Sequence, residues 1–244
     1  MIPVSVAIIT KNEEKNITDA LESVKEFDDI VIVDSFSSDR TSEICRIYTE
    51  RVFQHEWQGY SKQKQMAVDL ARNEWVLILD ADERVTPELK EEIKSSVSGS
   101  SCSGFYIPRK SFFLGKWIRH SGWWPDHVLR LFRKDSGRLY DRHVHEKVML
   151  KGKAGHLRNP LIHIAYRTIG EFIDKADRYS TLAAMELKKD RRHVNPISLI
   201  FRPVITFFRI FIIRQGFRDG VNGLILSLLY SYYTFLKYVK VWEK

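Results

Sequence analysis

Short apolar runs alternate with amphipathic stretches along the N-terminal part of the chain. The runs have the length of buried strands, and the stretches between them place apolar residues on one face of a helix. We expect strands at residues 4–9, 30–33, 51–54 and 75–79, and helices at residues 17–27, 41–49, 61–72 and 88–97. Strand and helix in repeated alternation predict an α/β fold, a mostly parallel sheet flanked by helices.

The pattern changes near residue 98. Residues 98–104 are rich in Ser and Gly and read as a surface loop. An aromatic and basic segment, two strands and a long helix are expected after it, at residues 105–124, 127–133, 147–150 and 169–191. We therefore divide the chain into an α/β domain at residues 1–168, with parts at 1–97 and 98–168, and a helical C-terminal extension at 169–244.

Polar and acidic clusters follow three of the expected strands. They lie at residues 10–14, 34–39 and 80–83. In open sheets of this kind, ligands bind beyond the carboxyl ends of the strands, where these clusters fall. The sequence therefore predicts one ligand site formed by all three.

The chain carries a positive surplus. Its formal charge is +8, which attracts phosphates of nucleic acid, of anionic lipid or of a nucleotide-linked substrate. The surplus is concentrated in the last quarter among bulky apolar residues, so we expect an anionic membrane surface rather than nucleic acid as a partner. Cys45 and Cys102 show no metal-ligand spacing, and Met1 leads directly into an apolar strand, so a reducing, cytoplasmic location is expected.

The C-terminal extension has the composition of an interfacial segment. Residues 220–236 contain no charge but are somewhat shorter than the roughly 20 residues that span a bilayer. Residues 197–213 are apolar except at Arg202 and Arg209. This pattern favours helices that lie on a membrane. The alternatives are a re-entrant or short spanning hairpin, and a helical cover on the catalytic domain or in a dimer.

Three motifs together resemble the signatures of family-2 glycosyltransferases. They are AIITKNEE at residues 7–14, VDSFSSDRT at 33–41 and LDADE at 79–83. The resemblance implies a GT-A fold, a nucleotide-sugar donor such as a UDP-sugar, and Mg²⁺ or Mn²⁺ as the cofactor.

Further segments resemble one bacterial subgroup, the lipopolysaccharide-core β-glucosyltransferases. They lie at residues 57–60, 63–64, 75–77, 124–126, 130–133 and 144–146. This second resemblance implies transfer of a hexose, with glucose as the first candidate, to a glycolipid or oligosaccharide acceptor.

The acidic motif beyond the fourth strand suits a metal-dependent transfer. A diphosphate leaving group gains negative charge as its bond to the sugar breaks, and a divalent cation neutralises that charge. Asp82 lies just beyond a buried strand and could bind the ion, although such a triplet alone could also be an exposed turn. By the resemblance, Asp80 lies near the ribose and Asp82 on the metal.

Other donor-site residues are expected in the first two clusters and on the third helix. Thr10 and Glu13 would line the base or ribose pocket, and Asp34 would accept a hydrogen bond from the base. The resemblance places Lys64 near the base or the phosphates, but a solvated helix face is an equal alternative.

The resemblance implies that an acid in this region is the catalytic base of an inverting transfer, and Glu146 and Asp126 are the two candidates. We prefer Glu146 as the base and expect Asp126 to bind the acceptor. His143 and His145 lack the helical spacing of a zinc site. The tryptophans of residues 105–124 either stack on sugars or pack a hairpin.

The sequence as a whole predicts an inverting hexosyltransferase, peripheral on the cytoplasmic face of the cell membrane. A nucleotidyltransferase is the rival enzyme, although the loop at residues 10–14 lacks the glycines of a phosphate loop. A catalytically inactive binding protein recruited to the membrane is the other alternative.

Overall fold

The computed structural model describes residues 1–140, 147–189 and 195–243. Strands are β1 (Ile2–Thr10), β2 (Phe27–Asp34), β3 (Val52–Gln54), β4 (Trp75–Asp80), β5 (Glu83–Val85), β6 (Gly104–Phe113), β7 (Lys116–Trp117), β8 (Asp126–Arg133), β9 (Gly137–Tyr140), β10 (Lys147–Leu150), β11 (Ala154–His156) and β12 (Leu161–Tyr166). Helices are α1 (Ile17–Val24), α2 (Thr41–Tyr48), α3 (Tyr60–Leu70), α4 (Pro87–Val97), α5 (Ile169–Lys189), α6 (Pro196–Phe208) and α7 (Val221–Trp242), with a π-helical turn η1 (Arg209–Ile213) and a 3₁₀ turn η2 (Gly216–Asp219).

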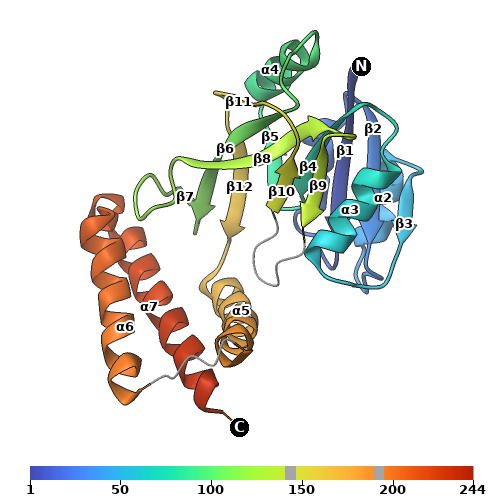
Figure 1. Ribbon diagram of the computed structural model, residues 1–244. Helices are drawn as coiled ribbons and strands as arrows, with labels where there is room; N and C mark the ends of the chain where they lie inside the picture. The colour runs from blue at the N-terminus through green and yellow to red at the C-terminus, as the bar shows by residue number, and fades with distance from the viewer. Residues whose placement is uncertain (141–146, 190–194, 244) are drawn as a thin grey trace. The chain divides into compact units, whose positions relative to one another are not determined.

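The main sheet has the strand order β3-β2-β1-β4-β8-β6-β12-β5 (Figure 1). Strands β3, β2, β1 and β4 run parallel, and β8 is antiparallel to β4. The register sets Thr10 opposite Asp34 and Ile9 opposite Asp80, so β1, β2 and β4 end at one level. The predicted α/β fold is confirmed, and its three polar clusters meet at one edge of the sheet.

Helices cover both faces of the parallel strands. Helices α1, α2 and α4 pack on one face, where the core includes Val6, Ile8 and Leu21. Helix α3 covers the other face, against Ala7 and Val33 (Figure 1). Alternate residues of a strand point to opposite faces, and β1 and β2 are apolar on both because both faces are covered.

Most expected elements of the N-terminal part are present, with small shifts at their ends. Phe27, expected on the first helix, is the first residue of β2 instead. Asn16 stands at the start of α1, but its side chain donates to Glu13 Oε2 at 2.9 Å instead of capping the helix. The short strands β5, β9 and β11, and β12 at Leu161–Tyr166, were not predicted, because such brief, partly exposed segments leave no clear apolar period.

The described chain divides into two compact units. One comprises residues 1–109 and 127–163, and the other comprises residues 110–126 and 164–244. The segment at residues 110–126, which we assigned to the α/β domain, thus packs with the C-terminal helices. In this second unit Phe113, Ile118 and Phe172 share a core.

A buried carboxylate ties that segment to the turn between α6 and α7. Asp219 accepts hydrogen bonds from the backbone N–H groups of Arg119 and His120, at 3.1 and 3.0 Å, and from the Ser121 hydroxyl at 3.2 Å. Helices α6 and α7 then run side by side as a hairpin (Figure 1). A Cβ atom on Gly223 would lie only 1.9 Å from the Gly216 carbonyl oxygen, so this close approach requires glycine.

Candidate functional site

The loops after β1 and β2 are cross-linked by hydrogen bonds. The Thr10 hydroxyl donates to Asp34 Oδ1 at 2.9 Å, and the Glu13 backbone N–H donates to Thr41 Oγ1 at 2.7 Å. Asn12 adopts a left-handed conformation (φ 57°), and its side-chain oxygen accepts from the Ser38 backbone N–H at 2.8 Å. The two loops therefore form one preorganised rim at the carboxyl end of the sheet.

Asp34 is the centre of this rim. Its side chain is fully buried and accepts hydrogen bonds from the Thr10 hydroxyl and from both the hydroxyl and the backbone N–H of Ser37. A buried carboxylate requires such donors, because an uncompensated charge is costly to bury. Within the protein, Asp34 thus holds Thr10 and Ser37 in place.

Phe36 is the most unusual residue of the rim. It has φ 53°, a left-handed conformation that costs a bulky side chain about 1–2 kcal/mol, yet its ring is 55% exposed. No signal in the sequence singled it out, because both its conformation and its exposure depend on the fold. An exposed aromatic ring held at some energetic cost beside the ends of β1 and β2 is a candidate ligand contact.

Helix α3 directs two polar side chains toward the same edge. The Gln63 side chain donates to Ser35 Oγ at 2.7 Å and is almost fully buried. Lys64 is only 3% exposed, and its Nζ lies 2.6 Å from Asp80 Oδ1. Lys64 therefore does not lie on a solvated helix face.

Asp80, the last residue of β4, joins a network of charges. Besides Lys64, it pairs with Arg130 of β8, and Arg130 also donates to Glu83 Oε1 at 2.8 Å. Glu83 is fully buried, accepts from the Asp80 backbone N–H at 3.1 Å and lies 3.5 Å from Arg109. Two acids and three cations thus fix the Asp80–Glu83 turn.

Desolvation opposes the ionisation of Asp80, but the attraction of Arg130 and Lys64 outweighs it and lowers the Asp80 pKa well below its usual range. The carboxyl group therefore stays ionised at neutral pH. Its contribution to stability is present above the unfolded-state pKa of about 4 and is lost only as the pH falls through the lowered folded-state pKa.

Asp82 lies in a different environment from Asp80. Its side chain is 23% exposed, and its Oδ2 lies 3.6 Å from Nε2 of His163 on β12. Strand β12 reaches this point because it pairs with β5, with His163 opposite Glu83. Sequence reasoning missed His163, since its strand was not predicted and it is distant from the acidic motif in the chain.

The Asp82–His163 pair fits two ligands of one divalent cation. Mn²⁺ accepts carboxylate oxygen and imidazole nitrogen, and Mg²⁺ favours oxygen. Two ligands at about 2.1 Å from one ion can be at most about 4.2 Å apart, so the observed separation is compatible. Among the described residues no group of three or more His, Cys, Asp or Glu side chains could hold a metal, so water and the donor would supply the other ligands.

The structure describes one of the two candidate bases, Asp126. Asp126 begins β8, is half-buried and belongs to the second compact unit. Glu146, with His143 and His145, lies outside the described residues.

One tryptophan of the aromatic segment, Trp117, contacts cations of its own unit. Lys110 Nζ lies 4.5 Å and Arg119 Cζ 4.3 Å from its ring centre.

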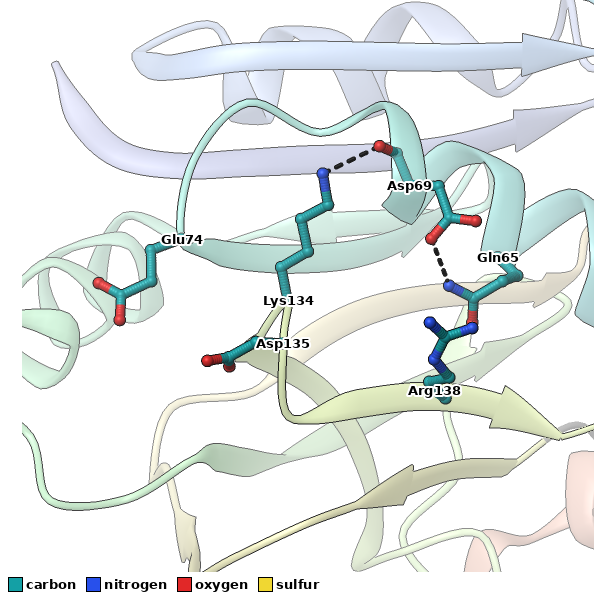
Figure 2. Close-up of a pocket in the computed structure, with 6 residues that line it drawn as sticks. All are labelled: Gln65, Asp69, Glu74, Lys134, Asp135 and Arg138. Carbon is teal, nitrogen blue, oxygen red and sulfur yellow. Dashed lines mark hydrogen bonds between the residues drawn. The ribbon is translucent and has the colours of Figure 1, made fainter.

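A hollow of about 360 Å³ lies elsewhere on the first unit (Figure 2). Its polar groups are used within the protein: Lys134 Nζ donates to the Asp69 carbonyl oxygen at 2.9 Å, and Gln65 donates to Asp69 Oδ1 at 2.8 Å (Figure 2). It lies beside Glu74, just before β4, and therefore at the opposite end of that strand from Asp80. These contacts join the C-terminal end of α3 to the turn between β8 and β9.

The sheet, its covering helices and the acidic motif beyond β4 define a GT-A glycosyltransferase. The chain belongs to glycosyl transferase family 2, whose family model matches residues 5–157. It is 32% identical to the lipopolysaccharide core biosynthesis glycosyltransferase LpsC of Rhizobium meliloti (strain 1021), over 100% of this chain and 93% of LpsC. An uncharacterised glycosyltransferase of Rickettsia conorii is 30% identical over 98% of this chain and 90% of its own.

Solved structures agree on the fold. The mannosyltransferase PcManGT from Pyrobaculum calidifontis, in complex with GDP-Man and Mn²⁺, has a TM-score of 0.52 at 16% identity, over 99% of this chain and 87% of its own. Mannosyl-3-phosphoglycerate synthase from Rubrobacter xylanophilus has a TM-score of 0.50 at 12% identity, over 79% and 76%. At these identities the likeness concerns the fold alone.

The charge network allows a stability prediction. Arg130→Gln should lower the free energy of unfolding by about 3 kcal/mol, because it leaves the buried Glu83 without its closest cation. Arg133→Gln on the same strand is the matched control: its partner Glu74 is 60% exposed, so about 0–1 kcal/mol is expected. Urea unfolding of both variants measures the difference, and equal losses would contradict the structural role of Arg130.

Proposed function

We propose that this protein is an inverting glycosyltransferase that moves a hexose, with glucose as the first candidate, from a nucleotide-sugar to a membrane-linked glycan of the lipopolysaccharide-core type. The observation that carries the proposal is the pair of partly exposed carboxylates of Asp80, the last residue of β4, and Asp82, just beyond it, at the carboxyl edge of the sheet. The full-length similarity to LpsC supports the acceptor class. The enzyme would work on the cytoplasmic face of the membrane.

In this proposal, residues 1–97 bind the nucleotide-sugar and residues 98–168 contribute the acceptor side. Thr10 and Glu13 line the base or ribose pocket, and the buried Asp34 keeps that rim in shape. Phe36 stacks on the base, which explains why an exposed ring is retained in a costly conformation. A rigid rim reduces the entropy lost on donor binding.

Asp80 and Lys64 act together beside the donor. Their ion pair leaves part of the Asp80 carboxylate accessible, at 27% exposure, for a ribose hydroxyl, while Lys64 and Arg130 keep it ionised. A hydrogen bond to an ionised carboxylate is stronger than one to a neutral oxygen. Asp80 thereby orients the donor in this proposal.

Asp82 and His163 would hold the divalent cation. When bound, Mg²⁺ or Mn²⁺ neutralises the charge that develops on the diphosphate leaving group. The pairing of β12 with β5 fixes the backbone of His163 next to the acidic motif, so the chain presents both ligands together. Glu146, as general base, would take the proton of the acceptor hydroxyl as that oxygen attacks the sugar.

The cation ligands generate the prediction that tests the function. Purified protein should hydrolyse or transfer from a nucleotide-sugar in the presence of Mn²⁺, and excess chelator should stop it. Asp82→Asn and His163→Ala should each weaken Mn²⁺-dependent donor binding by about tenfold or more, because each removes a direct ligand of the cation and loss of an outer-shell partner alone costs about 10- to 100-fold. His156→Ala removes an exposed imidazole elsewhere and should bind as wild type does. Calorimetric titration of donor with and without Mn²⁺ measures this.

Assays of turnover with the purified protein separate the rival functions. Release of pyrophosphate from a nucleoside triphosphate and a sugar phosphate would indicate a nucleotidyltransferase. Donor binding without any turnover would indicate an inactive binding protein. Full turnover by Asp82→Asn in chelator would contradict the cation site while leaving the transferase activity in place.

Phe36 gives a second prediction. Phe36→Gly should weaken donor binding by about tenfold, since stacking of a base on an aromatic ring is worth about 1–3 kcal/mol. The variant should be no less stable, within about 1 kcal/mol, because glycine adopts the left-handed conformation without steric cost. Phe36→Leu keeps the unfavourable conformation but removes the aromatic ring, so it should bind donor as weakly as Phe36→Gly. Donor affinity equal to wild type in Phe36→Leu would exclude stacking.

The catalytic base gives a third prediction. Glu146→Gln should lower kcat by about 10²- to 10⁴-fold with donor affinity nearly unchanged, which is the usual contribution of a general base. Asp126→Asn should chiefly raise the acceptor KM. If Asp126→Asn is inactive at saturating acceptor while Glu146→Gln is nearly normal, the role of base passes to Asp126.

A further inference from the structure

We propose that the exposed apolar face of α6 and η1 is the surface by which this protein binds an anionic lipid bilayer. We call it the α6 face and define it by Ile200, Phe201, Val204, Ile205, Phe208 and Ile212. The inference rests on the proposed function only for what the membrane contact achieves, namely access to a lipid-linked acceptor. The surface itself is argued from the second compact unit alone.

The α6 face is an uninterrupted stripe. Its six side chains follow one another at spacings of one, three or four residues, which places them on one side of the helix. Each is between 46% and 68% exposed. Scattered single apolar residues on a surface need no explanation, but a contiguous stripe of this size marks an interaction site.

The charges around the α6 face are positive. Between residues 195 and 242 the sequence has six cations, Arg202, Arg209, Arg214, Arg218, Lys237 and Lys240, and one acid, Asp219. Of the cations, Lys240 pairs with Asp177 of α5, so five are left to give this region its positive charge. That acid is 3% exposed and is engaged by the segment at residues 119–121. Arginines at the border of an apolar face can place their stems along it and their guanidinium groups among lipid headgroups. The surface is therefore complementary to an anionic bilayer.

The opposite side of α6 is held by α7, which argues for a helix lying on the membrane. Residues Pro196–Ile213 are long and apolar enough to cross a membrane, by length and composition only. However, Ser231 of α7 donates to the Pro203 carbonyl oxygen at 2.9 Å, and Arg202 donates to the Tyr238 hydroxyl at 2.7 Å. Buried Pro203 and Ile210 complete the contact. An α6 that spanned the membrane by itself would have to leave these partners, whereas an interfacial helix keeps them. A hairpin of α6 and α7 that spanned the membrane together would keep them too, and alkaline extraction distinguishes it from an interfacial helix.

A second copy of the chain is a poorer occupant. A symmetric pairing brings each surface against itself, so the arginines beside the α6 face would meet arginines. Like charges placed together oppose association. An anionic bilayer offers apolar tails to the stripe and negative headgroups to its border.

Flotation of the full chain with lipid vesicles tests the proposal. The protein should bind vesicles of phosphatidylcholine with about a third phosphatidylglycerol, and bind pure phosphatidylcholine more weakly. Phe201→Glu with Phe208→Glu should lower the partition coefficient by roughly a hundredfold or more, because two apolar rings no longer enter the acyl region. Both side chains are exposed, so the fold should be retained, which circular dichroism checks.

Two matched controls show whether a loss of binding comes from the α6 face or from any loss of exposed apolar or charged side chains. Ile47→Glu with Met149→Glu also replaces two exposed apolar residues, at 77% and 62% exposure, but in the other unit, and should not change binding. Arg209→Gln with Arg218→Gln should lower binding to the anionic vesicles by about 30-fold and leave binding to pure phosphatidylcholine unchanged. Lys94→Gln with Lys151→Gln is its control in the first unit.

Three results would overturn the proposal. They are vesicle binding that the Phe201/Phe208 variant retains, resistance to alkaline extraction as for a spanning helix, and absence of vesicle binding together with a dimer that the same variant dissociates. Transfer to a water-soluble acceptor analogue is measured in parallel. Loss of vesicle binding with that activity intact concerns the α6 face alone, whereas wild-type protein that binds vesicles but never uses a nucleotide-sugar contradicts the proposed function instead.

Discussion

The candidate site depends on how two acids are neutralised where β4 ends. Asp80 and Glu83 sit at a turn enclosed by α3, β8 and β5, and charges in such a position are tolerated only when they are paired. Lys64 and Arg130 supply the pairing from α3 and from β8. Because each cation comes from a different element, the network positions both elements against the turn, and it thereby sets the direction in which the chain continues to Asp82.

The neighbouring carboxylates differ because their partners differ. Asp80 is held by two permanent cations, so little of its charge is left to attract a further cation. Asp82 lies beside an imidazole, which can itself act as a ligand when neutral. These environments favour hydrogen bonding by the first acid of the motif and, in our proposal, cation binding by the second, which are the roles that the family resemblance implies.

The parallel half of the sheet was predictable, and so were the antiparallel strands β8 and β10, whereas β5, β9 and β12 were not. An apolar run followed by a polar cluster is a local signal, and it located Thr10, Asp34, Asp80 and Asp82 at the ends of β1, β2 and β4. The burial of Lys64 is not local, since it depends on a carboxylate from another element. His163 required knowledge that β12 pairs with β5, and the left-handed conformation of Phe36 has no signature in residue type. Sequence reasoning therefore found the acids and named Lys64, but it did not find the ion pairs of Asp80 or the histidine beside Asp82.

Positive charge serves two separate purposes in this chain, and net charge alone hides the difference. Lys64 and Arg130 are buried and paired, so they stabilise the site but contribute little to the field outside it. The arginines near the α6 face have no exposed acid between residues 195 and 242 to balance them. The exposed positive charge that would attract a phosphate therefore lies next to an apolar surface. An anionic bilayer can interact with both the charge and the apolar surface, whereas a nucleic acid can interact only with the charge.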